Sequence, residues 1–141
     1  MNGSGQLRLI SGRRLLSPRG NGTRPTTARV RQAVMNIVRP RLMECRWLDL
    51  CSGSGVMACE AIERGARAVT AVEKDPRCAS ICKRNLEDVA KSHSGRTEVT
   101  VIKRDLLLWL KQDCGEIGFD LIYFDPPLRW RDVPTDTFAT Q

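Results

Sequence analysis

The sequence predicts an α/β fold with a doubly wound, mainly parallel sheet, because strand-like and helix-like segments alternate from residue 47 onward. A second observation is the glycine-rich turn Gly53-Ser54-Gly55, which lies between the first strand and the next helix, as in nucleotide-binding folds. A third is a strongly basic stretch that precedes the alternation. We therefore divide the 141-residue chain into a basic N-terminal arm, 1–46, and a core, 47–141.

The positive charge of the chain is concentrated in the arm. The first 47 residues hold ten arginines and one acidic residue, Glu44, so their net charge is +9. The remaining residues hold 13 basic and 15 acidic side chains, a net charge of −2, which gives +7 for the whole chain. An arginine-rich arm on a mildly acidic core is typical of a protein that binds nucleic acid. The alternative is a solvated, charged tail.

The arm is expected to form a small hairpin and one helix. Two short apolar and basic runs separated by a Ser-Gly pair predict the hairpin, and turn residues follow it. Thr26 or Thr27 caps the helix, and Pro40 ends it. These elements span 7–10, 13–16 and 28–38. The helix face that is expected to meet the core carries Val30, Ala33, Val34, Ile37 and Val38, which recur at helical spacing.

The core is expected to contain four strands and three helices. Short apolar runs predict the strands, Gly65 stops the first helix of the core, and Pro76 opens the second. The expected strands span 47–51, 68–72, 98–102 and 119–124. The expected helices span 57–64, 76–91 and 105–112.

The turn after the first core strand predicts a nucleotide-type cofactor site. Gly53 to Ala58 fits the pattern G-x-G-x-x-G/A, and Glu73 follows Gly53 by 20 residues, at the end of the second strand. Glycines let the backbone approach a ligand, the helix N-terminus offers N–H donors, and an acid at that position accepts both ribose hydroxyls. The alternative is a tight turn without a ligand.

Asp49 favours one cofactor over another. It lies within the first strand, four residues before Gly53. A carboxylate there would repel the pyrophosphate of a dinucleotide, but it suits the cationic methionine end of S-adenosylmethionine. Asp105, at the end of the third strand, is placed to accept the adenine amino group, and its alternative role is to cap the following helix. These acids lie at strand ends, where open α/β sheets bind ligands.

The fourth strand ends in Asp125-Pro126-Pro127, beside the first strand in this topology. The exocyclic amine of a base is a weak nucleophile because its lone pair is delocalised into the ring. Hydrogen bonds from the amine to Asp125 and to a backbone carbonyl would orient it toward a methyl group. The two prolines fix the turn and offer no competing N–H. The alternative is a rigid loop that caps the strand.

These motifs resemble those of the RsmD-type 16S rRNA guanine-N2 methyltransferases. The resemblance rests on Asp49-Leu50-Cys51-Ser52-Gly53-Ser54-Gly55, Val72-Glu73-Lys74-Asp75 and Asp125-Pro126-Pro127. A more specific match is the arm segment with Arg24-Pro25-Thr26 followed by Arg29-Val30-Arg31, which is not general to methyltransferases. The resemblance covers residues 7–128.

The resemblance implies a Rossmann-like, S-adenosylmethionine-dependent methyltransferase fold. It also implies methyl transfer to the 2-amino group of a guanine in 16S rRNA, either free or in an assembling small ribosomal subunit. The implied cofactor site contains Asp49, Cys51, Gly53, Ser54, Gly55, Glu73, Lys74 and Asp105. The target amine is expected to meet Asp125, Pro126, Pro127 and Leu128. The RNA is expected to meet Arg13, Arg14, Arg24, Thr26, Arg29 and Arg31.

Two features depart from the family pattern. An aromatic residue normally follows Asp-Pro-Pro and stacks on the flipped base, whereas this chain has Leu128, so weaker substrate binding is expected. Family members also continue further and supply the last strands of the sheet, whereas residues 129–141 are polar and carry no strand pattern. The fourth strand is therefore expected to be an exposed apolar edge, which predicts either self-association through that edge or poor stability.

Other function classes fit the sequence less well. No apolar run approaches the ~20 residues that a membrane span needs, and the six cysteines contain no Cys-x-x-Cys pair, so we expect a cytoplasmic protein without a metal site. A nicotinamide-dependent oxidoreductase explains neither Asp49 nor the Asp-Pro-Pro motif. A DNA adenine methyltransferase shares the chemistry of the fourth strand, and only the arm argues against it. A non-catalytic fragment that binds RNA and cofactor is the remaining alternative.

Overall fold

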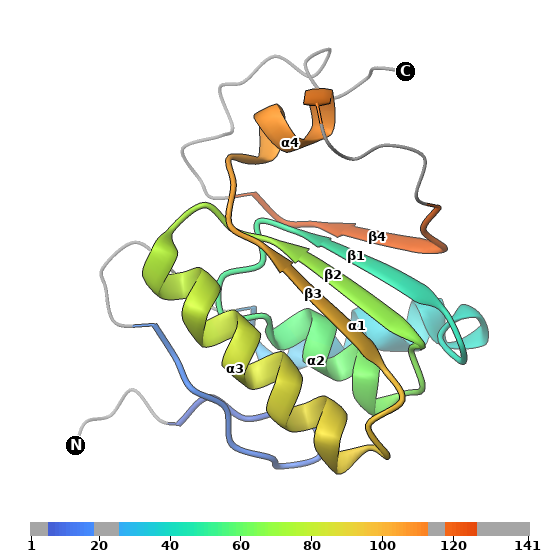
Figure 1. Ribbon diagram of the computed structural model, residues 1–141. Coiled ribbons are helices and arrows are strands. Elements are labelled where there is room, and N and C mark those ends of the chain that lie inside the picture. The colour runs from blue at the N-terminus through green and yellow to red at the C-terminus, as the bar shows by residue number, and fades with distance from the viewer. Residues whose placement is uncertain (1–5, 19–25, 113–117, 127–141) are drawn as a thin grey trace.

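The computed structural model describes residues 6–18, 26–112 and 118–126, which form a parallel sheet with helices on both faces (Figure 1). The strands are β1 (Arg46–Leu50), β2 (Ala68–Val72), β3 (Glu98–Ile102) and β4 (Leu121–Phe124). The helices are α1 (Ala28–Val38), α2 (Val56–Glu63), α3 (Pro76–Ser92) and α4 (Leu106–Gln112), and a 3-10 turn, η1 (Arg39–Arg41), follows α1. The α/β prediction is confirmed, and the predicted bounds of strands and helices agree within two residues.

The strand order of the sheet is β3-β2-β1-β4, and every neighbouring pair is parallel. The chain therefore adds β2 and β3 on one side of β1 and then returns to place β4 on the other side. This reversal falls between β1 and β4. The carboxyl ends of strands at such a reversal are where open α/β sheets bind their ligands.

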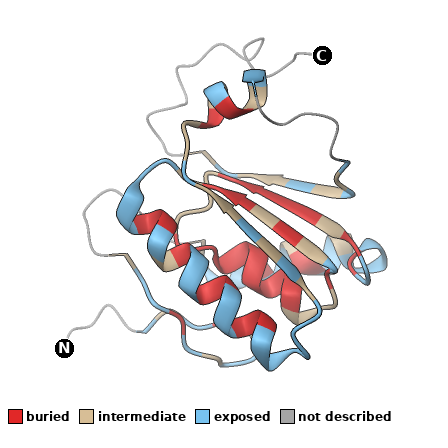
Figure 2. Cartoon of the chain, viewed as in Figure 1, coloured by how far each residue is buried: buried red, intermediate tan, exposed pale blue. Residues whose placement is uncertain are grey.

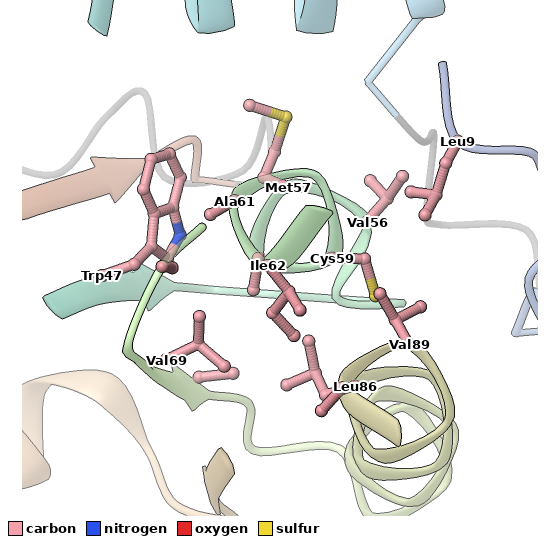
Figure 3. Packing of buried hydrophobic residues seen from close by; sticks show 14 of the residues in the cluster. Leu9, Trp47, Val56, Met57, Cys59, Ala61, Ile62, Val69, Leu86 and Val89 are labelled. Carbon is pink, nitrogen blue, oxygen red and sulfur yellow. The ribbon is translucent and has the colours of Figure 1, made fainter. Parts of the chain in front are cut away.

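The main hydrophobic core lies between the sheet and helices α1, α2 and α3, which cover the same face (Figures 1 and 3). All residues of α2 from Val56 to Ile62 are buried, since the sheet, α1 and α3 surround this helix. A helix that is buried on all sides is typical of the centre of a core. Figure 3 shows the packing of Leu9, Trp47, Met57, Ala61, Ile62, Val69, Leu86 and Val89.

The opposite face of the sheet is covered by α4 (Figure 1). Leu106 and Trp109 of α4 pack with Leu48 and Val72. The outer strands β3 and β4 are less buried than β1 (Figure 2), and Ile122 in β4 is 62% exposed. Among the described residues β4 pairs with β1 alone, so its other edge is open. No helix in the described ranges is both long and apolar enough to cross a membrane.

The arm packs on the core. Its first described segment turns back on itself around a single antiparallel bridge between Arg8 and Arg14, which confirms the predicted hairpin in a minimal form. Leu9 and Leu15 are buried in the main core. The arm thus shares its apolar interior with α2 and α3, although the sequence marks it as a separate basic segment.

The buried face of α1 differs in part from the prediction. The predicted face is confirmed in part, since Val34 and Val38 pack against the main core. Val30 and Ile37, which were expected on the same face, are exposed, Ile37 to 79%. Arg31 and Met35 are buried instead. The physical reason is an ion pair: Arg31 Nε lies 3.2 Å from Oε2 of Glu60 in α2, and the Glu60 side chain is 0% exposed. A buried acid needs a positive partner, and this need sets the rotation of α1.

Candidate active site

Four acidic side chains lie in or after the four strands. Asp49 is in β1, Glu73 follows β2, Asp105 follows β3, and Asp125 follows β4. In the sheet Asp49 pairs with Tyr123, two residues before Asp125. Because the carboxyl ends of parallel strands meet at one edge, these acids lie at the same edge of the sheet, and the charges of Glu73 and Asp125 act on Asp49.

The turn between β1 and α2 contains two glycines that serve different purposes. Both have a left-handed backbone, with φ of 55° at Gly53 and 82° at Gly55. A β-carbon on Gly55 would lie 2.7 Å from Cys82 Sγ, so the close approach of α3 requires a glycine there. A β-carbon on Gly53 would meet no atom within 4 Å. Gly53 therefore borders open space that a ligand can occupy.

Glu73 fastens this turn to the end of β2. Its Oε1 accepts a hydrogen bond from the Gly53 N–H at 2.9 Å, and its Oε2 accepts one from the Asp75 N–H at 3.0 Å. The predicted 20-residue spacing between Gly53 and Glu73 thus corresponds to a direct contact. Lys74 beside them is exposed. Each carboxylate oxygen has a further lone pair, so Glu73 can still accept hydroxyl donors.

Asp49 is a buried acid with one unsatisfied oxygen. It is 2% exposed, and its Oδ2 has no partner with hydrogen-bonding geometry among the described residues. Burial is the main cause that raises the pKa of Asp49 to about 7. The Ala58 N–H and the Trp47 indole lower this pKa, whereas the negative charges of Glu73 and Asp125 raise it. A cationic ligand group at this oxygen would supply the missing hydrogen-bond donor and stabilise the negative charge of the carboxylate.

Three more of the predicted cofactor residues have clear structural roles. Cys51 adopts a left-handed φ of 59° directly after β1. Ser54 is buried, and its carbonyl accepts from Asn85 Nδ2 in α3 at 2.9 Å. Asp105 Oδ2 accepts from the Leu108 N–H at 3.1 Å, so it caps α4, which was its alternative role. The glycine turn is therefore held by α3, whereas Asp105 serves the start of α4.

Asp125 lies at the end of β4, close to the start of α1. Thr26 Oγ1 is 3.5 Å from Asp125 Oδ2. Tyr123 stacks on Trp47 of β1, with ring centroids 6.2 Å apart and planes inclined by 20°. Burial raises the pKa of Tyr123, the Thr26 hydroxyl lowers it, and the Asp125 charge raises it. Thr26, Tyr123 and Asp125 therefore form one cluster.

The predicted RNA-binding arginines take different positions. Arg14 and Arg29 are exposed, and Arg13 is half-buried and donates to a serine of α3 at 2.6 Å. Arg31 departs from the expectation. It is 4% exposed, and its nitrogens donate to Glu60 and to two backbone carbonyls, so an RNA phosphate has no access to it. The physical reason is again the buried acid in α2.

Some predicted residues lie outside the described ranges, and two contributors were not predicted. Outside the described residues lie Arg24, Pro127 and Leu128. Tyr123 was not singled out, although residues two apart in a strand share a face, and this placed it beside Asp125. Asn85 gave no signal, because its bonding partners at Leu16 and Ser54 are distant in sequence.

Comparison with known proteins identifies the family. The family model described as Conserved hypothetical protein 95 matches residues 4–140. The Ribosomal RNA small subunit methyltransferase D of Haemophilus influenzae is 35% identical over 133 residues, which are 92% of this chain and 67% of the relative. The protein of the same name from Escherichia coli K12 is 31% identical over 132 residues, which are 91% of this chain and 63% of the relative.

Solved structures agree with the sequence relatives. The candidate methyltransferase yhhF of Escherichia coli superposes with a TM-score of 0.72 at 28% identity, over 92% of this chain and 68% of that one. This chain thus spans about two thirds of the length of its relatives. The sheet order, the glycine turn and the family match agree, and the chain belongs to the Conserved hypothetical protein 95 family, the family of the RsmD proteins.

Proposed function

We propose that this protein transfers a methyl group from S-adenosylmethionine to the 2-amino group of a guanine in small-subunit rRNA. The observation that carries the proposal is the position of Asp125 at the end of β4, across from the buried Asp49 and the glycine turn of β1. This arrangement supports Asp125 as the proposed amine acceptor, beside the proposed site for a cationic cofactor. The names of the relatives, Ribosomal RNA small subunit methyltransferase D, support rRNA as the substrate.

The residues present fit S-adenosylmethionine. The unsatisfied Oδ2 of Asp49 suits the ammonium group of the cofactor, and the open space at Gly53 admits it. The free lone pairs of Glu73 suit the ribose hydroxyls, and Asp105 is the acid proposed for the adenine. Cys51, Ser54, Gly55 and Lys74 complete the proposed site. When bound, the cofactor supplies a methyl group activated on a positively charged sulfur.

The proposed role of the protein in catalysis is to hold the target amine in one orientation. The Asp125 carboxylate and the Pro126 carbonyl accept the two N–H groups, which directs the nitrogen lone pair toward the methyl group. Fixing two reactants in line is a major source of rate enhancement for such transfers. Pro127 and Leu128 are proposed to border the base.

We propose that the arm, 1–46, supplies the electrostatic part of RNA binding and that the core, 47–141, supplies the chemistry. Arg14 and Arg29 are exposed, and Arg13 lies on the surface of α3, so these side chains can approach phosphates. Arg24 is proposed for the same role. Phosphate contacts of this kind make the affinity fall steeply as salt is added.

The test is a methyl-transfer assay on the purified 141-residue chain. The protein is incubated with labelled S-adenosylmethionine and small ribosomal subunits that lack the modification, and the RNA is digested to identify the labelled nucleoside. Label in N2-methylguanosine is the expected result, and Asp125→Ala is the matched inactive control. A parallel incubation with a DNA duplex in place of the subunits tests the alternative, and label in its adenine alone would support a DNA methyltransferase. Bound cofactor and RNA without transfer would indicate a non-catalytic fragment.

A further inference from the structure

A buried cluster of charges joins the arm to α2. Glu60 is fully buried, its Oε2 accepts from Arg31 Nε at 3.2 Å, and its Oε1 accepts from Arg64 Nη1 at 2.8 Å. The Ile10 N–H also donates to Oε2, at 2.9 Å. A buried charge that loses its partner strongly destabilises a fold. The pairing with Glu60 therefore holds the Arg31 guanidinium in one position.

The other nitrogens of Arg31 hold the backbone of the arm. Nη2 donates to the Arg8 carbonyl at 2.6 Å, and Nη1 donates to the Thr26 carbonyl. The next residue, Thr27, caps α1 by accepting from the Val30 N–H at 3.3 Å. Thr26 is therefore fixed on one side by a buried guanidinium and on the other by the start of a helix.

From this fixed position the Thr26 hydroxyl reaches Asp125, which lies 99 residues further along the chain. The separation of 3.5 Å between Oγ1 and Oδ2 is long for a hydrogen bond. Catalytic hydrogen bonds are often long before substrate binds and shorten in the complex. A carboxylate at the end of a strand can rotate, and a donor beside it restricts the orientation in which it accepts the amine.

We propose that Thr26 is a positioning residue, which orients the Asp125 carboxylate, and that the buried Arg31–Glu60 pair keeps Thr26 in place. This inference rests on the proposed methyl transfer, in which Asp125 accepts the target amine. It gives Thr26 and Arg31 a role different from the RNA contact that the sequence suggested. The arm then contributes to the reaction itself and not only to RNA affinity.

The first test separates positioning from binding. Thr26→Val keeps the shape of the side chain and removes the donor, so we expect kcat to fall about tenfold, while KM for the cofactor and for the RNA stays unchanged. Thr26→Ser retains the hydroxyl and is expected to retain kcat. Thr97→Val is the matched control: it removes a threonine hydroxyl that donates to the Ala66 carbonyl at 2.9 Å, just before β3, and leaves kcat unchanged. Arg31→Lys keeps a positive charge opposite Glu60 but lacks the fork of nitrogens that also donates to the Arg8 and Thr26 carbonyls. We expect it to lower kcat as Thr26→Val does.

The second test needs neither RNA nor cofactor. Tyr123 is the one tyrosine of the chain, so the tyrosinate absorbance reports on this cluster alone. Burial raises the pKa of Tyr123, as do the charges of Asp125 and Asp49, while the Thr26 hydroxyl lowers it. We expect a higher tyrosine pKa in Thr26→Val and no change in Thr26→Ser or Thr97→Val. The titration is followed over the pH range in which circular dichroism shows the fold intact.

The two tests together decide the proposal. An unchanged kcat in Thr26→Val would overturn it, because the Asp125 carboxylate would then be oriented without the Thr26 hydroxyl. An unchanged tyrosine titration would show that Thr26 makes no contact with Tyr123. A raised KM for RNA at unchanged kcat would also overturn it, since Thr26 would then bind RNA. If the wild-type chain transfers no methyl group, the proposed function fails, and the titration still shows whether Thr26 holds the cluster around Asp125.

Discussion

Asp49→Asn removes a charge that burial makes unfavourable in β1. The pKa of Asp49 is raised from 3.8 to about 7 in the folded protein. The unfolded chain therefore loses this proton at much lower pH than the folded protein does. Stability that depends on the protonated side chain is fully present below pH 3.8 and is lost as the pH rises through about 7. The free energy of unfolding should decline over this range.

The magnitude follows from the difference between the two pKa values. It is about 3 pKa units, and each corresponds to about 1.4 kcal/mol, so full ionisation of Asp49 costs the folded protein about 4 kcal/mol. Between about pH 5 and about pH 8 the free energy of unfolding should fall by about 2–3 kcal/mol through this group alone. Asparagine carries no charge, so the variant should lack this part of the decline.

The assay is urea unfolding followed by tryptophan fluorescence, for both proteins across this pH range. Asp75→Asn is the matched control. Asp75 is exposed, and its pKa is lowered mainly by the Cys78 N–H, so it stays charged throughout and the control should keep the wild-type decline. An equal decline in Asp49→Asn and wild type would refute the assignment of Asp49 as a buried group that titrates near neutral pH.

Three further changes test other parts of the fold. Gly55→Ala should lower the free energy of unfolding by about 2–4 kcal/mol, because alanine is strained at a left-handed φ and its β-carbon would clash with Cys82. A thermal melt like that of wild type would contradict the close approach of α3. Arg31→Met should lower the free energy of unfolding by about 3–5 kcal/mol, and the double variant with Glu60→Met should recover much of that loss. Additive losses of stability in the double variant would contradict the pairing of the two charges. Ile122→Lys on the exposed β4 strand should weaken concentration-dependent self-association in sedimentation velocity without lowering the melting temperature. A wild-type protein that is monomeric at all concentrations would contradict the expected self-association through this edge.

The elements of the fold could be predicted because their signals are local. Pro76 opens α3, glycine turns separate strands from helices, and the predicted bounds agree within two residues. The orientation of α1 could not be predicted in this way. Counting apolar residues favoured the face with Ile37, whereas the actual face is set by the pairing of Arg31 with Glu60. An ion pair between distant segments leaves no periodic trace in either segment.

In the candidate site, too, contacts within one βαβ unit could be predicted, whereas contacts between the arm and the core could not. The contact between Gly53 and Glu73 was predictable, since a fixed spacing in a βαβ unit places the two residues together. The approach of Thr26 to Asp125 depends on how the arm packs across the sheet, and the sequence carries no spacing rule for that. Asn85, which bonds both the arm and the glycine turn, is likewise a tertiary contact.

The arm precedes in the chain the residues that hold it, so it is synthesised before them. Ile10 bonds to Glu60, Leu16 bonds to Asn85, and Thr26 reaches Asp125. Contacts between such distant positions form slowly, because the intervening chain must be ordered first. During translation the arm therefore cannot dock before α3 has emerged from the ribosome, and until then its arginines lie in an undocked segment. Completion of the core ends that period, so the timing of core folding sets how long the arginines of the arm remain in an undocked segment.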